Sequence, residues 1–94
     1  MKQEFDIDMA KVYGVPEAIV LEIIKKTIIE RCYPVNWNTA VQIPTYVFCD
    51  EMPYVKKKTV ERAVSHLKSE GIITVFRTWC NNYSITEKGM TFLT

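Results

Sequence analysis

The chain has 94 residues, enough for one domain with one hydrophobic core. Hydrophobic residues make up 48% of it, charged residues 24%, and the formal net charge is +1, a composition that argues against intrinsic disorder. No apolar run approaches the roughly 18 residues of a membrane span, and residues 1–6 contain no apolar signal segment. We therefore expect a cytoplasmic protein with no membrane partner.

The small net charge conceals an uneven distribution along the chain. Residues 1–55 carry five basic and eight acidic residues, a net charge of −3, whereas residues 56–77 carry six basic and two acidic residues, a net charge of +4. A basic segment within a near-neutral chain is typical of a site for an anionic partner. The alternative interpretation is a helix face that is simply solvated.

Two helices are predicted in the first third of the chain. A short apolar cluster after Asp6 predicts a brief helix with Gly14 at its end. Pro16 and Glu17 suit the first turn of a second helix, and apolar residues at helical spacing then continue over residues 15–32. We expect this second helix to be apolar on more than one face and mostly buried.

A short strand and a short helix follow. Turn-forming residues at 33–38 separate the long helix from an alternating strand at residues 40–43. Pro44 ends the strand, and the apolar side chains of residues 46–49 predict a short helix after it. A break at residues 52–54 separates this helix from the next one.

The clearest helix covers residues 56–70. Its apolar residues lie at positions i, i+3, i+4 and i+7, namely Val60, Ala63, Val64 and Leu67. Gly71 is a natural C-terminal stop, and the β-branched run at residues 72–76 predicts a strand. A polar loop leads to a returning strand at residues 83–85, and Thr86 resembles the N-cap of a final short turn. Together, these elements predict an α+β fold, a single winged helix-turn-helix domain.

The face of helix 56–70 opposite its aliphatic stripe is basic and carries hydroxyl groups, which is typical of a recognition helix in a DNA major groove. Arg62 can bond O6 and N7 of guanine, and Thr59 can contact a thymine methyl group. Glu61 either weakens phosphate binding or accepts a hydrogen bond from N4 of cytosine. The candidate DNA-binding residues on this helix are Lys56, Lys57, Lys58, Thr59, Glu61, Arg62 and Ser65.

Three consecutive lysines, residues 56–58, stand at the start of this helix. Positive charge is unfavourable there because the helix dipole already places partial positive charge at the N-terminus. Free amide groups at a helix N-terminus also attract phosphate. The lysines therefore favour a polyanionic partner, with their ammonium groups on backbone phosphates.

The tip of the predicted hairpin supplies a second group of candidate DNA-binding residues, namely Arg77, Trp79 and Asn81. A wing can lay an arginine on a phosphate or in a minor groove. Three interpretations of Trp79 stay open: it stacks on DNA, anchors a protein partner, or folds back onto the core.

The sequence contains no motif of an enzyme: no glycine-rich phosphate loop, no nucleophilic serine motif and no metal-binding pattern. His66, the only histidine, is expected to stand alone on the flank of helix 56–70. Cys32, Cys49 and Cys80 are widely spaced, so we expect reduced thiols. A zinc site that they form with His66 is the alternative, although the spacing is unlike that of structural zinc sites. We therefore expect no catalytic activity, no cofactor and no metal.

A family resemblance rests on three segments: residues 9–24 (MAKVYGVPEAIVLEII), residues 57–73 (KKTVERAVSHLKSEGII) and residues 83–89 (YSITEKG). They resemble the opening, the recognition helix with the first wing strand, and the second wing strand of small winged-helix domains in phage and plasmid replication proteins. These are the replisome organisers and the DnaD-like N-terminal domains. The resemblance implies binding of double-stranded DNA by residues 57–62, in replication initiation or transcription regulation.

The second hypothesis is a winged-helix module for protein–protein contact that does not bind DNA. Helix 15–32, the N-terminal segment and Trp79 would then form the interface with a second copy of the chain or with a replication or regulatory protein. The apolar character of helix 15–32 favours self-association under either hypothesis. Exposed basic residues would favour DNA, whereas an exposed aliphatic stripe would favour a protein partner.

Overall fold

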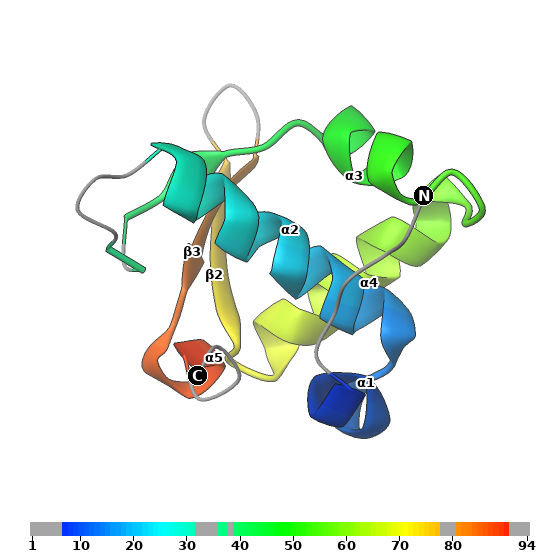
Figure 1. Cartoon of the computed structure of the whole chain (residues 1–94), viewed down its shortest axis with the longest axis horizontal. Helices are drawn as coiled ribbons and strands as arrows, with labels where there is room; N and C mark the ends of the chain where they lie inside the picture. The colour runs from blue at the N-terminus through cyan, green and yellow to red at the C-terminus, as the bar shows by residue number, and fades with distance from the viewer. Residues whose placement is uncertain (1–6, 32–35, 38, 78–80, 91–94) are drawn as a thin grey trace.

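Figure 1 shows a computed structural model of the chain, which describes residues 7–31, 36–37, 39–77 and 81–90. The expected α+β fold and the order of its elements are confirmed, with shifts of one or two residues at their ends. In chain order the elements are α1 (Ile7–Tyr13), α2 (Val15–Arg31), β1 (Val41–Gln42), α3 (Thr45–Glu51), α4 (Lys57–Ser69), β2 (Ile73–Arg77), β3 (Asn81–Ile85) and α5 (Glu87–Met90). Among the described residues, no helix has the length and apolar character to cross a membrane.

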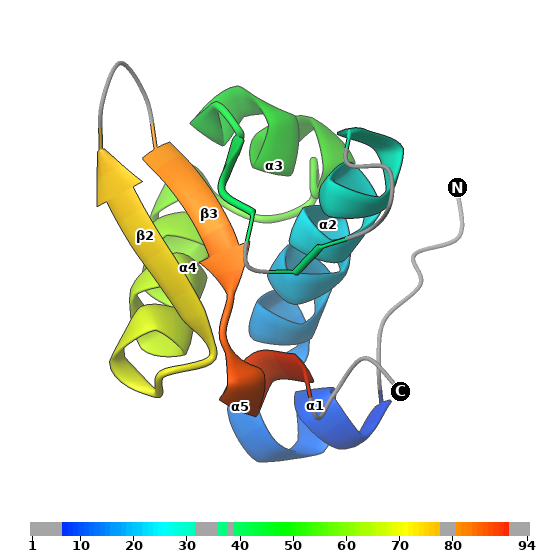
Figure 2. The ribbon, with the colours of Figure 1, turned by 90° about the vertical axis from the view of Figure 1, so that its left-hand side faces the viewer.

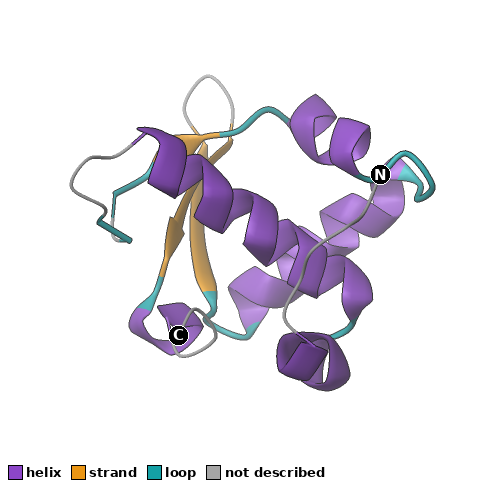
Figure 3. Cartoon of the chain, in the orientation of Figure 1, coloured by secondary structure: helices purple, strands orange, loops and turns teal. Residues whose placement is uncertain are grey.

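The core centres on α2, which buries side chains around much of its circumference. Four consecutive residues, Ala18 to Leu21, are at most 3% exposed, and Ile24 and Ile28 are fully buried. Successive residues of a helix point in directions about 100° apart, so four buried residues in a row do not fit on one face. α2 packs against α1, α4, β1 and β3, and Figure 3 shows it reaching from α4 to the strands. The prediction of a helix that is apolar on more than one face is confirmed.

Within the described residues, three strands form an antiparallel sheet in the order β1-β3-β2. β2 and β3 make a hairpin in which Arg77 pairs with Asn81 next to the turn. On the other edge of β3, β1 places Val41 opposite Tyr83. Side chains two residues apart share one face of a strand, and Tyr83 and Ile85 are accordingly both buried.

α4 ends where its glycine predicts. Gly71 has a φ angle of 74°, in the left-handed region that glycine adopts without strain. Its N–H donates to the carbonyl oxygen of Lys68 at 3.1 Å. The N–H of Ile72 donates to the carbonyl oxygen of Leu67 at 3.0 Å, and both of these side chains are fully buried. This is a Schellman stop with its hydrophobic contact, and it directs the chain from α4 into β2.

Thr86 caps α5, as predicted. Its hydroxyl accepts a hydrogen bond from the N–H of Gly89 at 3.1 Å and lies 2.9 Å from the carbonyl oxygen of Ile72. Gly89 is itself buried, and a Cβ at this position would clash with that same carbonyl oxygen. Close packing of α5 against the backbone of Ile72, the residue before β2, therefore requires glycine.

Two ends of the molecule are distinct in the views of Figures 1 and 2, which share a vertical axis. α1 and α5 lie at the lower end. α3 lies at the upper end, where β2 finishes at Arg77 and β3 begins at Asn81. The turn end of the β2–β3 hairpin and α3 therefore lie at the same end of the molecule.

Candidate nucleic-acid interface

α4 divides into a buried stripe and an exposed surface, as its periodicity predicts. Val60, Ala63 and Leu67 are at most 1% exposed and pack into the core. The opposite surface, which we call the α4 outer face, is an open groove along the helix that is lined by Lys58, Glu61, Arg62, Ser65, His66 and Ser69. All of these except the half-buried His66 are exposed.

The N-terminal end of α4 concentrates positive charge. Lys56 occupies the N-cap position without a side-chain capping hydrogen bond, and the first turn, which the structure describes in full, holds no acidic residue. Lys57 and Lys58 follow and are exposed. Lys57 Nζ lies 4.0 Å from Glu61 Oε1, with the two side chains 69% and 57% exposed. Water screens such a pair, so it contributes little to stability.

Thr59 lies beside these lysines but is half-buried, unlike the other predicted residues of this helix. It therefore sits at the edge of the exposed surface. Arg62 and Ser65 are exposed and lie on the α4 outer face itself.

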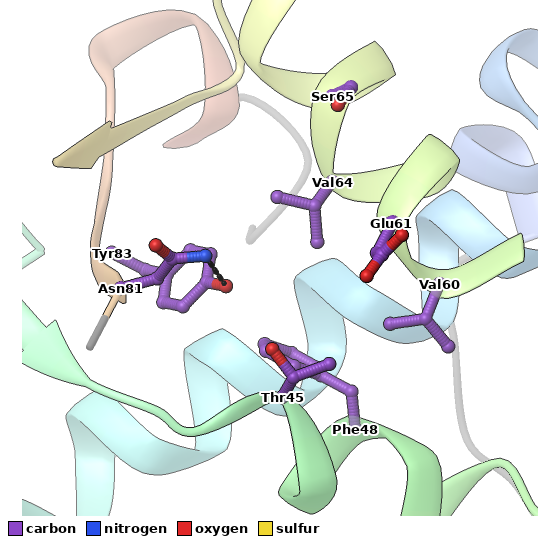
Figure 4. A pocket seen from close by; sticks show the side chains of 8 residues that line it. All are labelled: Thr45, Phe48, Val60, Glu61, Val64, Ser65, Asn81 and Tyr83. Atoms are coloured by element: carbon purple, nitrogen blue, oxygen red, sulfur yellow. Dashed lines mark hydrogen bonds between the residues drawn. The ribbon is translucent and has the colours of Figure 1, made fainter. Parts of the chain in front are cut away.

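The hairpin places two predicted site residues next to its turn. Arg77 is the last residue of β2 and is exposed, whereas Asn81 is the first residue of β3 and is half-buried. The side-chain amide of Asn81 donates to the hydroxyl oxygen of Tyr83 at 3.3 Å, which holds the amide in place (Figure 4). Trp79, the third predicted residue of the hairpin, lies outside the described residues.

A cavity of about 250 Å³ lies where α3, α4 and β3 meet (Figure 4). Its floor and walls are apolar and comprise Phe48, Val60, Val64 and the ring of Tyr83. Its rim is polar and comprises Thr45, Glu61, Ser65 and Asn81. The structure thus brings Glu61 and Ser65 of α4 together with Asn81 of the hairpin.

Sequence reasoning missed the other residues of this cavity. Thr45 and Phe48 come from α3, and Tyr83 comes from β3. These residues belong to separate elements of the chain, and the cavity arises from the way α3 and β3 pack on α4. No pattern within a single helix or strand signals that arrangement.

His66 does not stand alone on α4, contrary to expectation. Its Nδ1 lies 3.2 Å from Oε1 of Glu17 in α2, and its Nε2 lies 3.7 Å from Oε1 of Glu70. The rings of His66 and Tyr13 meet edge to face, with centroids 5.8 Å apart. The packing of α1 and the start of α2 against α4 creates this cluster, which sequence spacing does not reveal.

In the parts of the chain that the structure describes, no group of three or more His, Cys, Asp or Glu side chains is placed to hold a metal ion. Cys49 is a half-buried free thiol on α3. Cys32 and Cys80, the other cysteines of the zinc alternative, lie outside the described residues.

No protein-family model matches the chain, and no curated protein or solved structure matches it either. Because one fold can host many functions, the function has to be argued from the charge and geometry of α4 and the hairpin.

Proposed function

We propose that the chain is a winged helix-turn-helix domain that binds double-stranded DNA. α3 and α4 are joined by a short turn, residues 52–56, and the β2–β3 hairpin follows α4 directly. In this assignment α4 is the recognition helix and the hairpin is the wing. The two elements contribute to one region, since Glu61 and Ser65 of α4 share a cavity with Asn81 of the hairpin.

The observation that carries the proposal is the charge at the start of α4. Residues 56–58 are three exposed lysines, at the end of the helix where its dipole is positive and where the first turn holds no acidic residue. This arrangement does not stabilise the helix. It does match a phosphate backbone, which both the lysines and the first-turn amide groups can bind.

The proposed contacts with DNA fall into two classes, those with phosphates and those with bases. Lys56, Lys57 and Lys58 bind phosphates, which provides affinity without sequence information. Arg62 and Ser65 lie about one and two turns further along α4 and face base edges in the major groove. From the wing, Arg77 and Asn81 support the complex by contacting the backbone or the minor groove. The role of such a domain would be in replication initiation or transcription regulation.

Fluorescence anisotropy with a labelled random duplex of about 20 base pairs tests this proposal. Four to five phosphate contacts predict a slope of about −4 in a plot of log affinity against log salt concentration, since each contact contributes about 0.9. Binding in the micromolar range at low salt is expected. Absence of binding at about 50 mM salt would contradict the proposal.

Paired variants locate the contacts on α4. The double substitution Lys57→Ala and Lys58→Ala should reduce the magnitude of the slope by about 2, because two phosphate contacts are lost. Lys26→Ala provides the matched control, since Lys26 is also exposed but lies on α2. Equal slopes for the double variant and the control would place the binding surface elsewhere.

Arg62→Ala separates base recognition from phosphate binding. If Arg62 bonds a guanine, its loss costs about 1–3 kcal/mol on the preferred site and relaxes one position of that site. Site selection from a random pool, followed by affinity measurement, gives both quantities. An unchanged preferred site and affinity would remove Arg62 from base recognition.

A protein–protein module is the second candidate, because the structure exposes aliphatic side chains on α1 and α2. Val12 and Val15, where α1 meets α2, are 66% and 47% exposed, and Ile29 of α2 is 48% exposed. Either a second copy or a replication or regulatory protein would cover them. Analytical ultracentrifugation discriminates the candidates: self-association without duplex binding favours this one.

A further inference from the structure

The cavity between α3, α4 and β3 has features that binding of a regular duplex does not require. A recognition helix contacts a paired duplex with side chains that project outward. Here, in addition, a recess opens beside those side chains, above a layer of buried groups: Phe48 is 0% exposed, and Val60 and Tyr83 are each 1% exposed. The recess therefore offers a binding site of its own.

The size of the recess suits one small ring system. Its volume of about 250 Å³ lies just below the roughly 300–1,000 Å³ of pockets for drug-sized molecules. Val60 and Val64 line it from α4, and Tyr83 lines it from β3 on the facing side (Figure 4). The ring of Phe48 meets that of Tyr83 edge to face, with centroids 5.4 Å apart, and this buried pair supports the recess from below.

The polar rim determines which ring would bind. Glu61 is a carboxylate, which only accepts hydrogen bonds when ionised. Among the bases, guanine presents two neighbouring donors, N1–H and the N2 amino group, on its Watson–Crick edge. Thymine presents a single donor between two carbonyl oxygens. The carboxylate of Glu61 would repel both of those oxygens. On the same rim, the hydroxyl of Ser65 can donate to O6 of guanine.

The surrounding charge explains how such a base would be brought to the recess. Lys57 lies 4.0 Å from Glu61 and Lys58 is its exposed neighbour, so phosphate-binding groups stand beside the carboxylate that would hold the base. An unpaired base is the least costly one to bring out of a DNA stack.

We propose that this cavity binds an unstacked guanine base of DNA held at the α4 outer face. The inference rests on the proposed function and adds a preference: duplexes that contain an unpaired guanine bind more tightly than fully paired ones. Burial of a base against the apolar side chains of the recess is worth about tenfold in affinity.

Three labelled duplexes of the same sequence test the inference by fluorescence anisotropy: one fully paired, one with a single extra guanine in the middle, and one with a single extra thymine. We expect the extra guanine to raise the affinity about tenfold over the paired duplex. Equal affinity for all three would overturn the cavity inference but leave the proposed function intact. Binding of none would overturn both, and an equal gain from guanine and thymine would show a preference for flexible DNA instead of a guanine site.

Variants connect the preference to the cavity. Ser65→Trp places a large ring at the rim and should bring the ratio of guanine-bulged to paired affinity close to one. Thr74→Trp is the matched control, because Thr74 is exposed on β2 and does not line the cavity, and it should keep the ratio. Glu61→Gln can donate as well as accept, so it should reduce the discrimination between guanine and thymine. An unchanged ratio in both Ser65→Trp and Glu61→Gln would overturn the inference.

Discussion

The two longest helices of the described chain, α2 and α4, use similar aliphatic residues for different purposes. In α2 a run of four consecutive side chains, residues 18–21, is buried, so the helix forms the centre of the core. In α4 the buried residues Val60, Ala63 and Leu67 are spaced three and four apart, which confines burial to one stripe. The difference shows that the spacing of apolar residues, more than their number, determines whether a helix supports the fold or presents a surface.

The basic residues of the two helices also differ, in how closely they contact the rest of the fold. On α2, Lys25 pairs with Glu22 at 3.6 Å, and Nη1 of Arg31 donates to the carbonyl oxygen of Gln42 at 2.6 Å, so basic groups contact the helix itself and β1. At the start of α4, Lys56 makes no capping hydrogen bond, and the Lys57 pair with Glu61 is exposed and long. The lysines at the start of α4 therefore make weaker contacts within the fold than Lys25 and Arg31 of α2 do.

The largest expected effect follows from the burial of α2. Ile24→Ala removes a fully buried side chain and should destabilise the fold by about 2–5 kcal/mol, because it loses apolar burial and leaves a cavity. Ile29→Ala, at a position of the same helix that is 48% exposed, should change stability by no more than about 0.5 kcal/mol. Urea denaturation of both variants measures the difference. Similar losses at the two positions would show that Ile29 is covered in solution, as the oligomer hypothesis requires.

The sequence predicted the fold well because its main elements have strong local signals. The stripe of α4, the stop at Gly71 and the cap at Thr86 each depend on residues within a few positions of one another. The strands followed from β-branched and aromatic runs, although β3 begins two residues earlier than expected, at Asn81. Pairing with Arg77 across the hairpin extends β3 to that residue, which its polar character did not suggest.

The sequence predicted the residues of the candidate site one element at a time, mainly on a single helix, α4. Periodicity placed Arg62 and Ser65 on the exposed side of α4, where the structure has them. The cavity depends on Thr45 and Tyr83, and the histidine cluster depends on Glu17, all from elements distant in the sequence. Such contacts arise from tertiary packing, which no spacing within one element encodes.

A smaller effect tests how α4 ends. Gly71→Ala should destabilise the fold by about 1 kcal/mol, because the φ angle of 74° is unfavourable for a residue with a Cβ. The space around the added methyl is open, so strain of the backbone is the only cost. Ser69→Ala, at an exposed position within the last turn of the same helix, should be neutral to within about 0.5 kcal/mol. Thermal denaturation that ranks Ser69→Ala as the more damaging variant would contradict the Schellman stop.

The smallest expected effect concerns the contact that joins the two helices outside the core. His66 on α4 and Glu17 on α2 lie 3.2 Å apart, with side chains 41% and 15% exposed. Because one partner is substantially open to water, a double-mutant cycle of His66→Ala and Glu17→Ala should give a coupling of about 0.5 kcal/mol. Glu17 also lies in the first turn of α2, where its charge favours the helix dipole. The cycle cancels that contribution, since it is lost equally with and without His66. A coupling near zero would mean that the apolar contacts between α2 and α4 hold the helices together without this pair.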